Sequence, residues 1–181
     1  MVQGTLFALM VTLRQLGVEF QTELKIIKEG EESQIYKEIE LYRQLKGTTD
    51  FAGKMYGDCM LAFYLSFVTY WFEAPHILLG RRGEAEIALL IFSSVTTIIW
   101  VLAAEFHYRV QHAIVEWTTF YLESESLSLE DRLKMFSIRW EVSTQPVAFS
   151  CRCFSATYKH LSSMLGLVVT YMIIVVQLNR D

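Results

Sequence analysis

Two long stretches without a charged residue constrain the fold of this chain more than any other feature. They run from Ile87 to Ala104 and from Leu161 to Leu178, 18 residues each. As α-helices, both would be about 27 Å long at roughly 1.5 Å per residue, close to the ~30 Å hydrocarbon core of a bilayer. We therefore predict that both stretches cross a membrane.

A third apolar stretch, from Cys59 to Gly80, is long enough to cross as well, but it contains Glu73 and His76. An ionisable side chain inside a span is costly and usually faces protein or water. Two interpretations fit: the two side chains are neutral or paired between helices, or they line a ligand cavity or ion vestibule beside Tyr70 and Trp71. With this third span, the predicted fold class is an all-α integral membrane helix bundle.

Composition excludes several classes of function. Of the 181 residues, 52% are hydrophobic and 20% are charged, the net charge is −4, and lysine and arginine form no cluster. A nucleic-acid-binding protein would carry a basic footprint, so we expect no nucleic-acid partner. The sequence has no nucleophile elbow and no phosphate-binding loop, so it does not support an enzyme or a cofactor.

The cysteines do not form a disulfide framework. Cys151 and Cys153 have C-x-C spacing, which differs from the C-x-x-C of redox and zinc sites, and Cys59 is far away in sequence. We interpret all three as free thiols.

The histidines do not indicate a metal site either, because His107 and His112 are five residues apart and do not share a helical face. Glu105 and Arg109 are four residues apart, as are His112 and Glu116. We expect surface pairs on a helix that leaves the membrane.

Basic residues predict the orientation. Six lysines and arginines lie between Leu24 and Asp58, and six lie between Glu105 and His160, whereas the loop between the first two spans has only Arg81 and Arg82. Basic residues favour the cytoplasm. We therefore expect a multi-pass plasma membrane protein with the 81–86 loop outside, Lys37 inside and the C-terminus extracellular.

The segments outside the spans are expected to be helical. Two of them have apolar residues at spacings of three and four, typical of amphipathic helices. These positions are Ile35, Ile39, Tyr42 and Leu45 in one segment, and Leu129, Leu133, Phe136 and Trp140 in the other. We expect these helices to pack in a cytoplasmic bundle continuous with the spans.

The apolar run from Met1 to Leu13 is too short to cross a membrane alone, at about 20 Å as a helix. It is either an interfacial or buried helix, or the tail of a span whose first half is missing.

Two spans carry polar stripes. For Ser93, Thr96 and Thr97, we expect hydroxyls that bond to their own backbone or to a neighbouring helix. Thr170 and Gln177 are two helical turns apart and share a face with Ile173. That face is either a contact between helices or the wall of a water-filled channel.

The run from Thr170 to Gln177 (TYMIIVVQ) resembles the signature that closes the last transmembrane helix of the insect gustatory receptor family: Thr-Tyr, five apolar residues and Gln. That pattern usually continues with Phe, where this chain has Leu178. The stretch from Arg132 to Gly166 also resembles the family's penultimate segment. The resemblance covers the whole chain but only the last three of seven helices, so we expect a fragment or a truncated gene product.

The resemblance assigns Cys59–Gly80 to helix S5, Ile87–Ala104 to S6 and Val147–Leu178 to S7, the last divided near Gly166 into an anchoring part and a pore-lining part. The helix around Leu6–Phe20 would be the inner end of S4. The chain then divides into four segments: 1–58 with cytoplasmic helices, 59–104 with two spans, 105–160 with cytoplasmic anchor helices, and 161–181 with the final span.

The resemblance implies a ligand-gated, non-selective cation channel for the perception of tastants, built as a homo- or hetero-tetramer in membrane lipid. The implied pore-lining residues are Thr170, Ile173, Val176 and Gln177. Trp140 and Phe149 would lie in the anchor where subunits meet. The candidates for the tastant pocket are Tyr70, Trp71, Glu73, His76 and Phe92. The alternative is a small three-span protein with a structural or assembly role and no conduction.

Overall fold

The fold is built from five α-helices. The computed structural model describes residues 2–29, 35–78, 84–124, 127–151 and 154–178, with side chains for all of these except 2, 26–29, 72–78 and 84–90. The helices are α1 (Val2–Glu29), α2 (Ile35–Leu78), α3 (Glu84–Glu123), α4 (Leu129–Thr144) and α5 (Tyr158–Leu178). Within the described ranges there is no strand beyond one isolated bridge between Ser150 and Ser155. The predicted all-α class is therefore confirmed.

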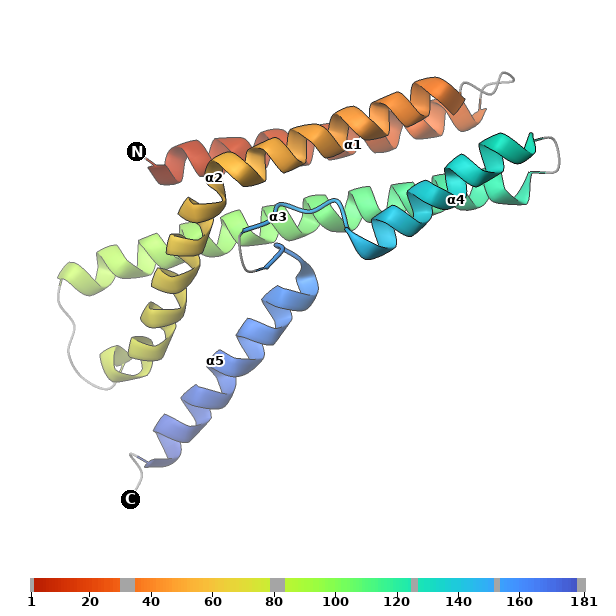
Figure 1. Cartoon of the computed structure of the whole chain (residues 1–181). Helices are drawn as coiled ribbons and strands as arrows, with labels where there is room; N and C mark the ends of the chain where they lie inside the picture. The colour runs from red at the N-terminus through yellow and green to blue at the C-terminus, as the bar shows by residue number, and fades with distance from the viewer. Residues whose placement is uncertain (1, 30–34, 79–83, 125–126, 152–153, 179–181) are drawn as a thin grey trace.

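Two helices are much longer than a membrane is thick. α2 has 44 residues and α3 has 40, about 66 and 60 Å at roughly 1.5 Å per residue. The expected boundaries at 58/59 and 104/105 fall inside these helices, so each continues without a break from its apolar segment into its charged segment. In Figure 1, α1, α3 and the first part of α2 run side by side, while the second part of α2 and α5 turn away toward the same side.

A parallel seam between α1 and α3 forms the centre of the packing. Leu6, Met10, Leu13, Phe20 and Leu24 of α1 are all buried, at the alternating spacing of four and three that keeps one helical face against a partner. Gly17 completes the series, and a Cβ there would lie 3.1 Å from the ring of Phe106. The N-terminal apolar run is thus the start of a helix with one buried face.

Only one of the two predicted amphipathic faces packs as expected. Ile35, Ile39, Tyr42 and Leu45 are buried, which confirms the first. The second prediction is wrong: Leu129, Leu133, Phe136 and Trp140 are between 59% and 76% exposed. α4 instead buries Met135, Ile138 and Val142, because this short helix has apolar residues on two faces and the second one meets α3.

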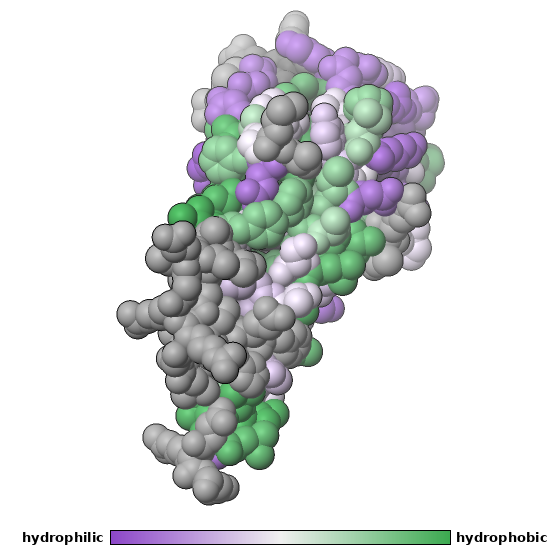
Figure 2. All heavy atoms as spheres, turned by 90° about the vertical axis from the view of Figure 1, so that its left-hand side faces the viewer, coloured by the Kyte–Doolittle hydropathy of each residue, from purple (hydrophilic) through white to green (hydrophobic). Residues whose placement is uncertain are grey.

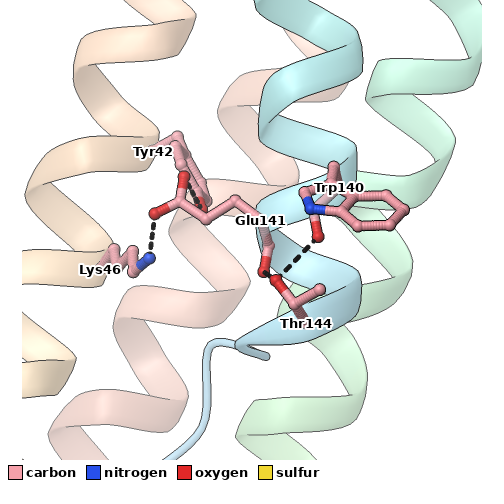
Figure 3. Close-up of polar contacts among 5 residues, drawn as sticks. All are labelled: Tyr42, Lys46, Trp140, Glu141 and Thr144. Atoms are coloured by element: carbon pink, nitrogen blue, oxygen red, sulfur yellow. Dashed lines mark hydrogen bonds and ion pairs between the residues drawn. The ribbon is translucent and has the colours of Figure 1, made fainter.

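A polar contact fixes α4 against α2. Glu141 of α4 accepts a hydrogen bond from the Tyr42 hydroxyl at 3.4 Å and pairs with the Lys46 ammonium group. Figure 3 shows these three side chains converging, with the Trp140 indole on the other side of α4. Burial and the nearby Glu141 carboxylate raise the pKa of Tyr42, so its hydroxyl keeps the proton that it donates.

The chain between α4 and α5 is a short hairpin seated on α2. Pro146 follows the last turn of α4, where its missing N–H cannot continue the helix. The backbone then pairs Cys151 N with Phe154 O at 2.8 Å and Ala156 N with Phe149 O at 2.9 Å. α5 continues through Gly166 as one helix, so the expected division into an anchoring and a pore-lining part, which is not marked by a break in the helix, stays a prediction.

Two glycines of α2 make room for this hairpin. A Cβ on Gly53 would lie 3.0 Å from the Ser150 carbonyl oxygen, and one on Gly57 would lie 3.1 Å from the same atom. Backbone atoms cannot move aside as a flexible side chain can, so only glycine allows this approach.

We predict opposite effects of alanine at two glycines of α2. At Gly47, a Cβ would meet nothing within 4 Å, so Gly47→Ala should raise the unfolding temperature through better helix propensity. Gly53→Ala gains the same propensity but pushes the hairpin away, and it should leave the protein about 1–3 kcal/mol less stable than Gly47→Ala. Thermal unfolding of detergent-purified protein measures both. Equal stabilisation by the two substitutions would show that the hairpin does not depend on this close approach.

Candidate functional site

Charged residues begin at one common level in the bundle. Arg14 is the first charge of α1, Asp58 the last before the apolar part of α2, Glu105 the first after the apolar part of α3, and Lys159 the last before that of α5. These points are close in space: the charge of Arg14 acts on Glu105, and Tyr158, next to Lys159, donates a hydrogen bond to Glu105 at 2.6 Å. The first turn of α5 also reaches α2, where the rings of His160 and Tyr64 are 5.4 Å apart.

We call the uncharged segments 2–13, 59–72, 87–104 and 161–178, together with the helix ends beyond them at 73–78 and 84–86, the apolar half of the protein. The described residues of 14–58 and 105–160 are the charged half. All four segments extend from the common level, and Figure 2 shows hydrophilic residues gathered at one end and hydrophobic residues toward the other. A bilayer requires this separation, because a charge in hydrocarbon is expensive.

Two helices contain segments long and apolar enough to cross a membrane. They are α5 and the stretch of α3 from Ile91 onward. Only 22% of the most apolar window of α5 is buried within the protein, whereas the core helix of a soluble protein would be mostly covered. The third span, Cys59–Gly80, stays a prediction, because the side chains of its last turns lie outside the described residues.

The exposed face of α5 is the candidate functional site. Buried residues line one side of the helix: Leu161, Met164, Val168 and Val175. Successive residues turn by about 100°, so Thr170, Ile173 and Gln177 lie within about 60° of one another on the opposite side. All three are exposed. We call this surface, with Gly166 one turn earlier, the open face of α5.

The four residues implied to line a pore are not equivalent. Thr170, Ile173 and Gln177 lie on the open face, whereas Val176 is about 100° away from Gln177, at the edge of that face. The Thr170 hydroxyl donates to the Gly166 carbonyl oxygen of its own helix at 2.8 Å. No described helix of this chain covers the open face, so these residues are not a contact between helices within the chain.

The five candidates for the tastant pocket fall into two groups, three aromatic residues whose side chains are described and two ionisable residues whose side chains are not. Tyr70 is buried at 2% exposure, and Trp71 packs against the rings of Tyr70 and Phe67 at 6.0 Å. Phe92 lies 5.7 Å from the ring of Phe63. Glu73 and His76 are in the last turns of α2, and their side chains lie outside the described residues. The structure therefore places three aromatic candidates in helix packing and leaves the two ionisable ones as predictions.

Several predictions for single side chains are confirmed. Glu105 pairs with Arg109 at 2.5 Å and His112 with Glu116 at 3.9 Å, as their spacing indicated. The hydroxyls of Thr96 and Thr97 donate to carbonyl oxygens one turn earlier, at 2.9 and 2.8 Å. Cys59 and Cys151 are free thiols, while Cys153 lies outside the described residues.

Phe149 is placed differently from its implied role. It is fully buried in the core of its own chain, so its ring is not available to a neighbouring subunit. Trp140 is 65% exposed and remains accessible.

A cluster of rings that no sequence pattern indicates packs against the first turn of α5. The imidazole of His160 stacks on Phe154 at 4.5 Å, and Trp100 of α3 and Tyr64 of α2 complete the cluster. Aromatic contacts of this kind stabilise packing beyond the area that they bury. No spacing rule could have found them, because the four residues come from three helices and the hairpin.

Comparisons with known proteins do not identify a relative of this chain. No family model matches the sequence, and a search of curated proteins gives no significant match. The resemblance to the gustatory receptors thus rests on the residues quoted above.

The Tyr158 contact predicts a pH-dependent stability. The hydrogen bond from Tyr158, together with Arg109, holds the pKa of Glu105 below its usual value. A carboxyl whose pKa is lowered in the folded state stabilises the fold at neutral pH. This contribution is lost as the pH falls below the pKa of an ordinary glutamate and through the lowered pKa of Glu105. Tyr158→Phe should therefore lower stability at pH 7 by up to about 1 kcal/mol.

The same substitution should cost much less once Glu105 is protonated, in acid. Tyr108→Phe on α3 is the matched control, because the Tyr108 side chain is 57% exposed and no hydrogen bond of its hydroxyl is found among the described residues. Thermal unfolding at neutral and acidic pH measures the difference. A cost for Tyr158→Phe that does not change with pH would remove Glu105 as the cause.

Proposed function

We propose that the chain is the C-terminal part of a gustatory receptor, a subunit of a ligand-gated, non-selective cation channel that senses tastants. The observation that carries the proposal is the open face of α5, which presents Thr170 and Gln177 on the side away from the other helices of the chain. The motif that resembles the receptor family contains these same residues.

The described residues of the chain supply no hydrogen-bond partner for the side chain of Gln177. A primary amide in hydrocarbon is costly unless it is hydrogen-bonded. The helices of this chain pack on the opposite side of α5, so the partner is another copy, a helix of another protein, or water. An assembly around the open face would supply such a partner along the whole length of the helix.

Four copies with this face on a common axis would form a pore. Gln177 would then offer its amide oxygen to a passing cation, and Ile173 would form an apolar constriction that can close by dewetting. Val176, at the edge of the face, would contact the neighbouring subunit as well as the pore.

The common charge level supports the membrane topology. It fits three spans that start at one interface, in a multi-pass plasma membrane protein with its C-terminus outside. The long charged segments would then be cytoplasmic, as the basic residues indicate.

The exposed face of α4 supports an anchor between subunits. Leu129, Leu133, Phe136 and Trp140 form an apolar stripe in the charged half, where lipid does not cover it. Such a patch is typical of protein contacts. Trp140 keeps its proposed role in this anchor, and Phe149 supports the chain's own core instead.

The tastant would bind in the apolar half, near Tyr70, Trp71 and Phe92, with Glu73 and His76 as polar contacts. Gating would require this pocket to be coupled to α5. The packing of α2 against α5 near Tyr64 and His160 gives such a connection.

The second candidate is an assembly protein without conduction. Its support is Gly166, where a Cβ would meet nothing within 4 Å. Small residues let another helix approach closely in a membrane. In this case, the open face of α5 would hold a helix of a different membrane protein.

Cysteine cross-linking tests the assembly. Gln177→Cys and Thr170→Cys should give disulfide-linked oligomers of the chain in membranes under mild oxidation. Val175→Cys, on the buried side of the same helix, is the matched control and should give none. The unsubstituted chain reports any background from Cys59, Cys151 and Cys153. Equal cross-linking at Val175 and Gln177 would contradict the orientation of α5.

Accessibility to a charged thiol reagent separates a channel from an assembly protein. In a full-length receptor that carries this C-terminal region, Ile173→Cys or Gln177→Cys should be modified faster in the open state, and the modification should block the current. Val175→Cys should not respond. Current that is unaffected by modification at all three positions would remove the open face from the pore.

A further inference from the structure

A small cavity in the charged half has the chemistry of a cation site. It lies where the end of α1, the first turn of α2 and the last turns of α3 meet, and its volume is about 30 Å³. The polar lining includes Glu38, Glu116 and Lys25, and the rings are Trp117, Phe120 and Tyr121. The open face of α5 and the tastant-pocket candidates are in the other half, so this cavity is independent of both.

Glu38 is the most buried acidic side chain of the lining. It is 1% exposed, whereas the side chain of Glu116 is 49% exposed. The Tyr121 hydroxyl donates to one Glu38 oxygen at 2.8 Å, and the Trp117 indole N–H donates to the other. Glu38 also lies in the first turn of α2, where the helix dipole favours a negative charge.

These two contacts bring no positive charge to Glu38. Indole and phenol are neutral donors, and among the described residues no lysine or arginine lies within ion-pair distance of Glu38. Acidic side chains are rarely fully buried without a cationic partner. A carboxylate accepts about four hydrogen bonds, so Glu38 has capacity for roughly two more.

We propose that this cavity binds the ammonium group of a primary alkylamine. The cation supplies the missing charge and donates to the free lone pairs of Glu38. The faces of Trp117, Phe120 and Tyr121 suit a cation, because an aromatic face carries negative electrostatic potential.

The size of the cavity favours a primary amine. One water needs about 10–15 Å³, so 30 Å³ holds an ammonium group and an adjoining methylene. Lys25 lines the same cavity, and its own ammonium group would compete with the ligand.

Binding of n-butylammonium to the purified full chain, measured by calorimetry, tests the proposal. Glu38→Gln keeps the shape of the side chain but removes its charge, and it should weaken binding about tenfold or more. Glu40→Gln is the matched control, because Glu40 is exposed on the same helix and does not line the cavity. Lys25→Met should tighten binding by removing the competitor.

The neutral ligand n-butanol keeps the test decisive if Glu38→Gln does not fold. On the unsubstituted chain, butanol should bind far more weakly than butylammonium, because it lacks the charge. Equal binding of the two ligands, equal binding by Glu38→Gln and Glu40→Gln, or no binding of butylammonium would each overturn the proposal.

Discussion

The separation of long uncharged helix segments from a charged half is the constraint on which the rest of the structure depends. Four helices change from uncharged to charged at the level of Glu105, and the Tyr158 hydrogen bond joins two of them there. Because hydrocarbon does not tolerate unpaired charge, this level separates two environments. In the apolar half, helices present exposed apolar side chains. In the charged half, specific polar contacts such as Glu141 with Tyr42 and Lys46 fix the positions of the helices.

The same separation makes the polar residues of α5 unusual, because they lie in the apolar half. In the charged half, an exposed Gln would be ordinary, but Gln177 follows a long run of apolar residues on a helix of which little is covered. Gln177 is exposed on the face of α5 that no described helix of the chain covers, and in the proposed assembly this face would meet water or another helix. The proposed channel and the alternative assembly protein differ in whether water or another helix occupies the open face.

Glu38 is the buried acidic residue of the charged half for which the described residues supply no cationic partner. Its carboxylate is buried beneath aromatic rings and held by two neutral donors, although water is available nearby. Trp117 and Tyr121 would lose their hydrogen-bond acceptor if an apolar residue replaced Glu38. The site places an acidic side chain at the junction of three helices, where a bound cation would also join these helices.

The sequence alone determined the helical class, two apolar segments of membrane length, the buried face from Ile35 to Leu45 and the local pairs such as Glu105 with Arg109. These features depend on neighbours within two turns of one helix, which periodicity describes. Only the tertiary structure decided which face of α4 is buried, because both Leu133 and Met135 lie on apolar faces and periodicity cannot choose between them. The same holds for Glu38, whose partners Trp117 and Tyr121 are 79 and 83 residues away in sequence. Packing against α2 and α3 also decided that the face with Thr170 and Gln177 is left uncovered by the described helices, because the sequence left open whether another helix covers it.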